Sequence, residues 1–148
     1  MANGKIYLRK ASIEDCDLLF EWANDEVTRA NSFNTDKIEY ESHVKWFEAL
    51  INNKHRAQYI LMIDENPIGQ VRFDIDGDVA EIGYSIQKSS RGKGYGKLII
   101  ELAVSMLKNE FPNIEKIVAK VKVENISSSK CFFNNNFQQD YIQYSLDV

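Results

Sequence analysis

The sequence has little proline, glycine or cysteine. Of its 148 residues, two are proline, seven are glycine and two are cysteine. So few prolines and glycines exclude a long disordered or linker-like segment. Cys16 and Cys131 lie far apart and lack the spacing of metal ligands, so we expect neither a disulfide framework nor a metal site. Two reduced thiols instead favour a cytoplasmic protein.

Excess positive charge and long apolar runs are lacking too. The formal net charge is −4 at pH 7, which argues against nucleic acid as the main partner because neutralising phosphates needs a cationic face. No apolar run approaches a membrane span, and the N-terminus turns polar too early for a signal peptide. The length fits one domain over residues 1–148. We therefore expect a cytoplasmic protein that binds no nucleic acid and no membrane.

What the sequence does have is a change of apolar period along the chain. Alternation of period two predicts strands, and a stripe of period 3.6 predicts helices. Ser12, followed by Asp15, forms a carboxylate variant of the capping box and predicts a helix start. The residues between the first two helices are polar and predict an irregular loop over 23–40. The resulting order, β-α-α-β-β-β-α-β-α-β, predicts an α+β fold with a mixed, mostly antiparallel sheet. The predicted strands are 5–11, 58–64, 68–76, 79–87, 114–124 and 141–148, and the predicted helices are 12–23, 41–52, one containing the stripe 98–107, and 125–136.

Three glycines stand where the strand 79–87 gives way to a helix, in the run Arg91-Gly92-Lys93-Gly94-Tyr95-Gly96. The first amides of a helix lack intrahelical partners and, with the helix dipole, form an anion site. Glycines let the backbone close around phosphate oxygens, and Arg91, Lys93 and Lys97 add positive charge. The run therefore predicts a pyrophosphate site, with a solvated glycine-rich turn as the alternative. A P-loop does not fit, because Leu98 follows Gly96-Lys97.

Two blocks of residues carry a family resemblance. Arg91-x-x-Gly94-x-Gly96 resembles the R/Q-x-x-G-x-G/A signature of the GNAT family of N-acetyltransferases, and Asn125-x-x-Ser128-x-x-x-Phe132 is similar to a second block of that family. The resemblance implies acetyl-CoA as cofactor and a sheet that splays between its fourth and fifth strands. We expect a bulge after Glu81 or near Tyr84 to open that gap. The expected cofactor-binding residues are Ile86, Arg91, Gly92, Lys93, Gly94, Tyr95, Gly96, Lys97, Asn125, Ser128 and Phe132.

Acetylation of an amine needs a base, a polarised thioester and a proton for the leaving thiolate. The resemblance implies that the Ile86 N–H polarises the thioester carbonyl. Glu81 is the candidate base, directly or through water, although it also fits a strand carboxylate that faces solvent. Phe132 stands where the family often has a tyrosine and has no proton to give. Tyr141 on the expected last strand is our candidate acid, with Tyr144, Tyr84 and water as alternatives.

The acceptor is expected between the first two helices, where aromatic rings mix with polar donors. The candidate substrate-binding residues are Trp22, Asn24, Arg29, His43 and Trp46. Their arrangement resembles acetyltransferases that act on nucleotide-linked amino sugars, such as the enzyme of pseudaminic-acid synthesis, and implies a small-molecule amine as partner. The alternatives are a protein or ribosomal-protein N-terminal amine, and a noncatalytic acyl-CoA-binding module. The aromatic residues also fit core positions, and the oligomeric state stays open between a monomer and a homodimer.

Overall fold

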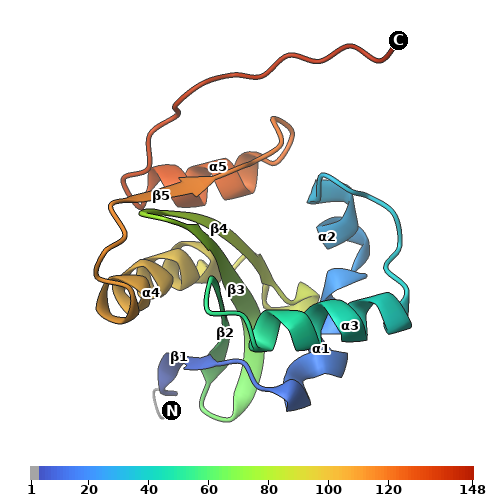
Figure 1. Ribbon diagram of the computed structural model, residues 1–148, viewed down its shortest axis with the longest axis vertical. Coiled ribbons are helices and arrows are strands. Elements are labelled where there is room, and N and C mark those ends of the chain that lie inside the picture. Colours follow the sequence, from blue (N-terminus) through green and yellow to red (C-terminus); the bar gives the residue numbers. More distant parts are fainter. Residues whose placement is uncertain (1–3) are drawn as a thin grey trace.

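A five-stranded mixed sheet runs through the middle of the molecule, with helices on both of its faces (Figure 1). The computed structural model describes residues 4–148. The strands follow one another across the sheet in chain order. The first four pair antiparallel, and the last pair is parallel, which confirms the predicted α+β fold. The strands are β1 (Ile6–Lys10), β2 (Arg56–Ile63), β3 (Asn66–Asp76), β4 (Val79–Ile86) and β5 (Lys116–Ala119).

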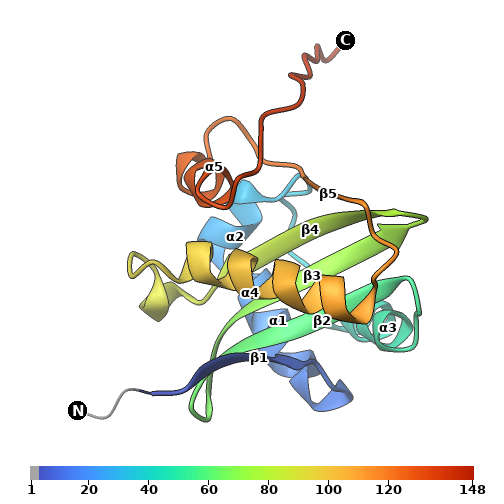
Figure 2. The same cartoon turned by 90° about the vertical axis from the view of Figure 1, so that its left-hand side faces the viewer.

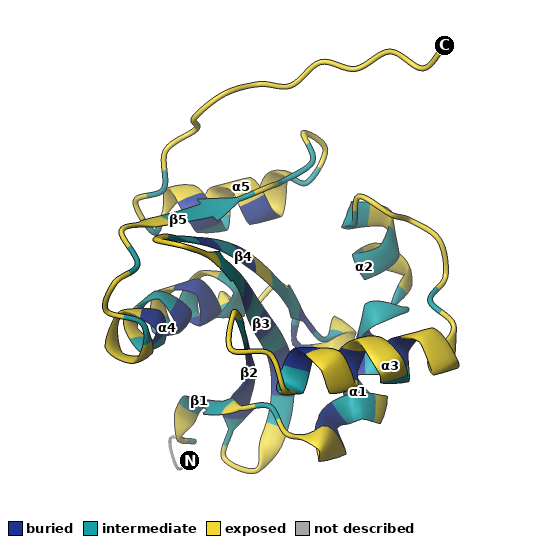
Figure 3. Cartoon of the chain, in the orientation of Figure 1, coloured by how far each residue is buried: buried dark blue, intermediate teal, exposed yellow. Residues whose placement is uncertain are grey.

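The two faces of the sheet carry two separate cores (Figures 2 and 3). Successive side chains of a strand point to opposite faces, so Tyr59 and Leu61 of β2 belong to one core while Ile60 and Met62 belong to the other. The first core is closed by α4 (Tyr95–Glu110) and α5 (Ile126–Phe133). The second is closed by α1 (Cys16–Ala23) and α3 (Tyr40–Ile51).

The segment expected to be an irregular loop contains a short helix, α2 (Glu26–Asn31). The Asp25 carboxylate caps it by accepting a hydrogen bond from the Thr28 N–H at 3.1 Å. Six residues are too few to show an apolar period, so the pattern misses this helix. The chain also contains two short 3₁₀ helices, η1 (Ile13–Asp15) and η2 (Lys88–Ser90). The predicted helix start at Ser12 is present, because the Ser12 N–H donates to the Asp15 carboxylate at 2.8 Å.

The end of the chain departs from prediction in two ways. The strand predicted over 114–124 is formed only over Lys116–Ala119, and the strand predicted over 141–148 is not formed. These last residues are exposed and run away from the sheet in both views (Figures 1 and 2). The alternation that predicts a strand is present, but a strand also needs a neighbour with which to exchange backbone hydrogen bonds. No helix within residues 4–148 is long and apolar enough to cross a membrane.

The gap in the sheet lies between β4 and β5, as expected, but its cause is different. β5 pairs only with Val79–Ile82 of β4, so residues 83–86 have no strand on that side. The expected bulge in β4 is wrong, because β3 and β4 stay in continuous register along their shared length. The one register shift recorded among these strand pairs lies between β2 and β3, where Leu61 pairs with Gly69 and Met62 pairs with Pro67, which leaves Ile68 of β3 as the extra residue. The sheet therefore opens because β5 ends at Ala119.

Candidate active site

A single cavity of about 940 Å³ extends from this gap to the helices on the other face of the sheet. On one side it is lined by the glycine loop and α5, and on the other by α1, α2 and α3. The C-terminal half of β4, which is only partly paired with β5, also borders the cavity, because residues 81–86 all line it. The residues expected to handle the cofactor and those expected to handle the acceptor thus share one space.

Gly92 and Gly94 have left-handed backbones, with φ of 76° and 85°. Side chains are strained in this region, so glycine is required by the backbone itself. A Cβ at either position would meet nothing within 4 Å, so the space beside each is open. Gly94 is also the N-cap of α4, and no side chain caps this helix. The first amides of a 16-residue helix therefore stay available to an anion.

The other residues of the loop have different surroundings. A Cβ on Gly96 would lie 2.8 Å from the Cys131 sulfur, so this glycine serves the close packing of α4 against α5. Tyr95 lines the cavity, whereas Lys93 and Lys97 are exposed and do not line it. Lys93 and Lys97 are thus placed to add charge near the loop from its outer side.

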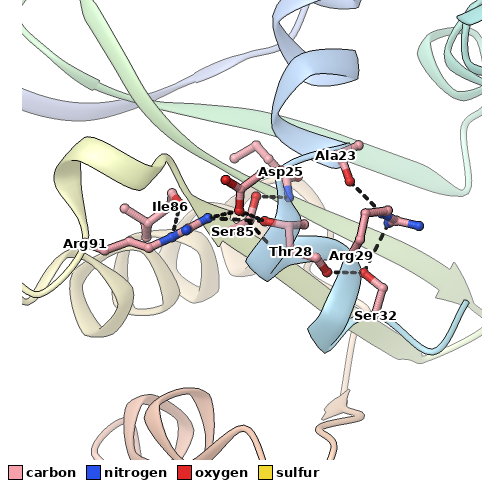
Figure 4. A network of polar contacts seen from close by, with 9 residues as sticks. Ala23, Asp25, Thr28, Arg29, Ser32, Ser85, Ile86 and Arg91 are labelled. Atoms are coloured by element: carbon pink, nitrogen blue, oxygen red, sulfur yellow. Dashed lines mark hydrogen bonds and ion pairs between the residues drawn. The ribbon is translucent and has the colours of Figure 1, made fainter. Parts of the chain in front are cut away.

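Arg91 is held by the protein on both sides of its guanidinium (Figure 4). Its Nε donates to the Ile86 carbonyl at 3.0 Å, and one terminal nitrogen donates to the Asp25 carboxylate at 2.6 Å. Burial alone raises the pKa of Asp25, but the hydrogen bonds from Arg91 and Thr28 outweigh it and hold that pKa below its ordinary value. The side chain that the sequence assigns to phosphate therefore fastens the glycine loop to the start of α2.

The backbone of Ile86 is turned toward the gap. The neighbouring Gln87 N–H donates to the Ile68 carbonyl of β3 at 2.9 Å. Hydrogen-bonding groups alternate sides along a strand, so the Ile86 N–H and carbonyl point away from β3. The Arg91 contact to that carbonyl agrees with this direction. Ile86 thus presents a backbone donor on the side where β4 has no neighbour.

The second sequence block lies across the cavity from β4. The Asn125 side chain caps α5 by accepting from the Ser128 N–H at 3.3 Å. The Ser128 hydroxyl accepts from the Tyr84 hydroxyl at 3.1 Å, and the Tyr84 ring meets the ring of Phe132 edge-on at 5.7 Å. All four residues line the cavity. Burial raises the pKa of Tyr84, so its phenol stays protonated and remains a hydrogen-bond donor.

The two candidate catalytic residues are placed very differently. Glu81 lines the cavity from β4, and its carboxylate is 3.1 Å from the Lys120 ammonium. Tyr141 is 72% exposed, belongs to the segment that leaves the sheet and does not line the cavity. Tyr144 is 89% exposed on the same segment. Because the expected last strand is absent, Tyr141 lies outside the cavity, whereas Tyr84, one of the alternatives, lines it, as Tyr95 does.

Two of the expected substrate-binding residues are engaged in holding the loop over 32–38. Asn24 accepts from the Ile38 N–H at 2.7 Å and donates to the Ile38 carbonyl at 2.9 Å. Arg29 donates to the carbonyls of Ala23 and Asn34 at 2.6 and 2.8 Å (Figure 4 shows the first of these contacts). Arg29 still lines the cavity, but Asn24 does not. Their polar groups shape the wall of the site.

The three remaining expected residues range from buried to half-exposed. Trp22 is 8% exposed and packs in the second core. His43 is 3% exposed, its Nε2 donates to the Cys16 carbonyl at 2.9 Å, and burial lowers its pKa. Trp46 is 37% exposed and lies 5.1 Å from the Arg72 guanidinium carbon. All three line the cavity, and the half-exposed Trp46 offers a ring face to a ligand.

A row of polar side chains on the sheet was missed by the sequence reasoning. Gln58 donates to Gln70 at 2.7 Å, and Gln70 donates to Ser85 at 3.0 Å. Together with Arg72 they line the cavity on neighbouring strands, and we call these four residues the polar floor. The signal was present, because Gln70 and Arg72 alternate with apolar residues in their strand. That pattern is also typical of a face in water, and here helices cover the face.

Comparison with known proteins gives consistent results. Residues 5–138 match the family model described as the acetyltransferase (GNAT) domain. The chain is 27% identical to an uncharacterized N-acetyltransferase, p20, of Bacillus licheniformis, over 92% of this chain and 80% of that protein.

Two solved structures are similar in fold. One is the aminoglycoside acetyltransferase AAC(6')-Ib in complex with coenzyme A and kanamycin, with a TM-score of 0.79, 20% identity, and coverage of 92% of this chain and 86% of that one. The other is RimL, a ribosomal alpha-N-protein acetyltransferase in complex with coenzyme A, with a TM-score of 0.80, 17% identity, and coverage of 95% and 83%.

Proposed function

Because the chain belongs to the GNAT family of acetyltransferases, we propose that it transfers the acetyl group of acetyl-CoA to a nucleotide-linked amino sugar. The primary amine of the sugar attacks the thioester carbonyl directly. One observation carries the proposal. A single cavity joins the glycine loop, the open end of β4, Glu81 and the polar floor. A cofactor seated on the loop and an acceptor seated on the floor would therefore meet beside β4.

The residues of the cofactor side fit acetyl-CoA, which supplies the acetyl group already activated as a thioester. The free amides at the start of α4, beside Gly92 and Gly94, bind the pyrophosphate. The open edge of β4 at residues 83–86 offers backbone groups to the pantetheine arm in the manner of an added strand. The Ile86 N–H would donate to the thioester carbonyl oxygen, and one such donor is worth about 3 kcal/mol in the transition state.

In this proposal Glu81 takes up a proton, and Tyr84 stabilises the leaving sulfur by a hydrogen bond. Glu81 accepts the proton of the attacking amine through a water molecule, since its carboxylate is already in contact with Lys120. The protonated Tyr84 phenol exchanges its hydrogen bond to the Ser128 hydroxyl for one to the leaving sulfur. Its raised pKa makes proton transfer from the phenol itself unfavourable, so the proton that reaches the thiolate comes from the amine or from solvent. Tyr84 thus takes the position expected of Tyr141, but as a hydrogen-bond donor and not as the acid.

The acceptor assignment rests on the polar floor and on Trp46. Amide and hydroxyl groups on a rigid sheet suit the hydroxyls of a sugar, because both partners donate and accept. The half-exposed ring of Trp46 beside the cationic Arg72 suits a base and its phosphates. Arg29 is already engaged, so in this proposal it shapes the wall and leaves the phosphate to Arg72.

A thiol-release assay with acetyl-CoA tests the function. We expect turnover with a UDP-4-amino-sugar and none with a panel of peptides bearing free N-termini. The Glu81→Gln variant should lower kcat on the order of 100-fold while coenzyme A affinity, measured by calorimetry, stays unchanged. Glu101→Gln, an exposed carboxylate on α4, is the matched control and should behave as the parent protein.

The other outcomes distinguish the alternatives. Turnover of peptides but not of the sugar nucleotide would favour acetylation of a protein N-terminal amine, as the name of the alpha-N-protein acetyltransferase RimL describes for that protein. Tight coenzyme A binding without turnover on any amine would favour a noncatalytic acyl-CoA-binding module. Unchanged turnover in Glu81→Gln would remove Glu81 as the base.

A further inference from the structure

Six of the seven glycines, all of which lie within residues 4–148, occupy positions that restrict the side chain, but Gly83 does not. Three have left-handed backbones, namely Gly77, Gly92 and Gly94. At three others a Cβ would lie 2.8 Å from a neighbouring atom, namely Gly4, Gly69 and Gly96. The φ of Gly83 is outside the left-handed region, and a Cβ there would meet nothing within 4 Å. Because glycine weakens the middle of a strand, its presence at this position indicates the close approach of a ligand.

Gly83 lies at the point where the sheet divides. The pairing of β4 with β5 ends at Ile82 and Ala119, so Gly83 is the first residue of β4 without a β5 neighbour. It is exposed although it lies in the middle of a strand, and it lines the cavity. A ligand that reaches from the acceptor side into the gap between β4 and β5 would therefore cross β4 beside this residue. We call the open space over Gly83 the aperture.

Polar side chains surround the aperture on the acceptor side. Glu81 and Ser85 flank Gly83 on the same face of β4, because side chains two residues apart point the same way. Arg72 lies directly opposite Gly83 on β3, and all of these residues line the cavity. The Ser85 hydroxyl accepts a hydrogen bond from Gln70 at 3.0 Å, so its own proton remains to be donated. A carboxylate, a cation and a hydroxyl thus enclose a short stretch of bare backbone.

We propose that Gly83 determines specificity for the acceptor, because the amine reaches the thioester through the aperture. This inference rests on the proposed transfer of acetyl groups in this cavity. The missing side chain lets the carbon that bears the amine lie against the backbone of β4, between Glu81 and Ser85. A side chain at position 83 would stand on the acceptor face and hold the amine away from the gap. The cofactor, bound at the glycine loop and in the gap, would not meet it.

The test compares Gly83→Ala and Gly83→Val with the parent protein, using acetyl-CoA and the UDP-4-amino-sugar. We expect kcat/KM for the acceptor to fall about tenfold with alanine and on the order of 100-fold with valine, because a larger side chain displaces the amine further. The Kd of coenzyme A, measured by calorimetry, should stay unchanged. The midpoint of urea unfolding should stay equal or rise, since the backbone of the unfolded chain is more restricted without glycine.

Gly77→Ala is the matched control, because it makes the same change at a glycine that has a φ of 63° and does not line the cavity. Alanine is strained at this φ, so the midpoint of urea unfolding should fall while kcat/KM stays unchanged. The two alanine variants should therefore separate stability from activity in opposite directions.

Equal kcat/KM in the parent protein and in both Gly83 variants would overturn the role of the aperture and leave the proposed function intact. A lower urea midpoint in Gly83→Ala would also overturn it, because the glycine would then serve the fold. If the parent protein acetylates peptides and not the sugar nucleotide, only the acceptor assignment fails, and the same comparison is made with the peptide. A parent protein that acetylates no amine would contradict the proposed function and the aperture together.

Discussion

The two sides of the cavity are built by different means. On the cofactor side, the groups that face the ligand belong to the backbone, namely the amides at the start of α4 and the Ile86 N–H. On the acceptor side, the groups are side chains, and many of them are already bonded to the protein, as Arg29 and Gln70 are. A backbone site restricts its sequence strongly because glycine tolerates the required φ with the least strain. A side-chain site allows the same residue either to bind a ligand or to hold a loop.

The variant Gly94→Val should disrupt the cofactor side most strongly and leave the acceptor side intact. Valine is strained at a φ of 85°, and its side chain would enter the open space beside the helix start. We expect coenzyme A binding to weaken on the order of 100-fold, equivalent to about 3 kcal/mol, as measured by calorimetry. Gly77→Val is the matched control, because Gly77 has a φ of 63° and open space but lies in the hairpin turn between β3 and β4.

Both glycine variants should lose some stability from the strained backbone, but only Gly94→Val should lose the cofactor. Equal affinity in the two variants would show that the cofactor does not approach the loop at Gly94. The backbone account of the cofactor side would then be wrong.

The variant Arg29→Met should disrupt the acceptor side and leave the cofactor side intact. Methionine keeps much of the length of the side chain but removes the hydrogen bonds to Ala23 and Asn34 that hold the loop over 32–38. We expect the free energy of unfolding to fall by about 1–3 kcal/mol and KM for the acceptor to rise about tenfold, with coenzyme A affinity unchanged. Denaturant titration and steady-state kinetics measure the two effects.

Lys37→Met serves as the control, since Lys37 is an exposed residue of the same loop. A loss of coenzyme A affinity in Arg29→Met that Lys37→Met does not share would mean that Arg29 contacts the cofactor. The separation of the two sides would then fail at that residue.

The smallest effect is a dependence of stability on pH that arises on the acceptor side. Burial lowers the pKa of His43 below its ordinary value of 6.5. A histidine with a lowered pKa stabilises the fold fully above pH 6.5, and this contribution declines as the pH falls toward the folded-state pKa, because the unfolded chain takes up the proton more readily. Unfolding titrations between pH 5 and 7 should show the decline, and His43→Gln should reduce it. His55→Gln, at an exposed position, should leave it unchanged.

The sequence predicted the cofactor side better than the acceptor side for a physical reason. Gly92 and Gly94 occupy positions whose left-handed backbone favours glycine. The placement of Ser128 and Phe132 on one face of α5 follows from helical spacing. The use of Arg29 to hold a loop, and of Gln70 and Ser85 to form a floor under helices, depends on contacts between distant segments. Such contacts leave no local period. The strand predicted over 141–148 failed likewise, since alternation does not show whether a neighbouring strand is present to pair with it.

The contact between Arg91 and Asp25 has a consequence for the order of events. It fastens the loop that we propose binds the pyrophosphate to the N-terminus of the helix that carries Arg29. If a ligand on the loop changes this contact, it also changes the free energy of the acceptor wall, and thermodynamic reciprocity requires the acceptor to alter cofactor affinity by the same factor. The two substrates are then expected to bind cooperatively, because each changes the affinity of the enzyme for the other.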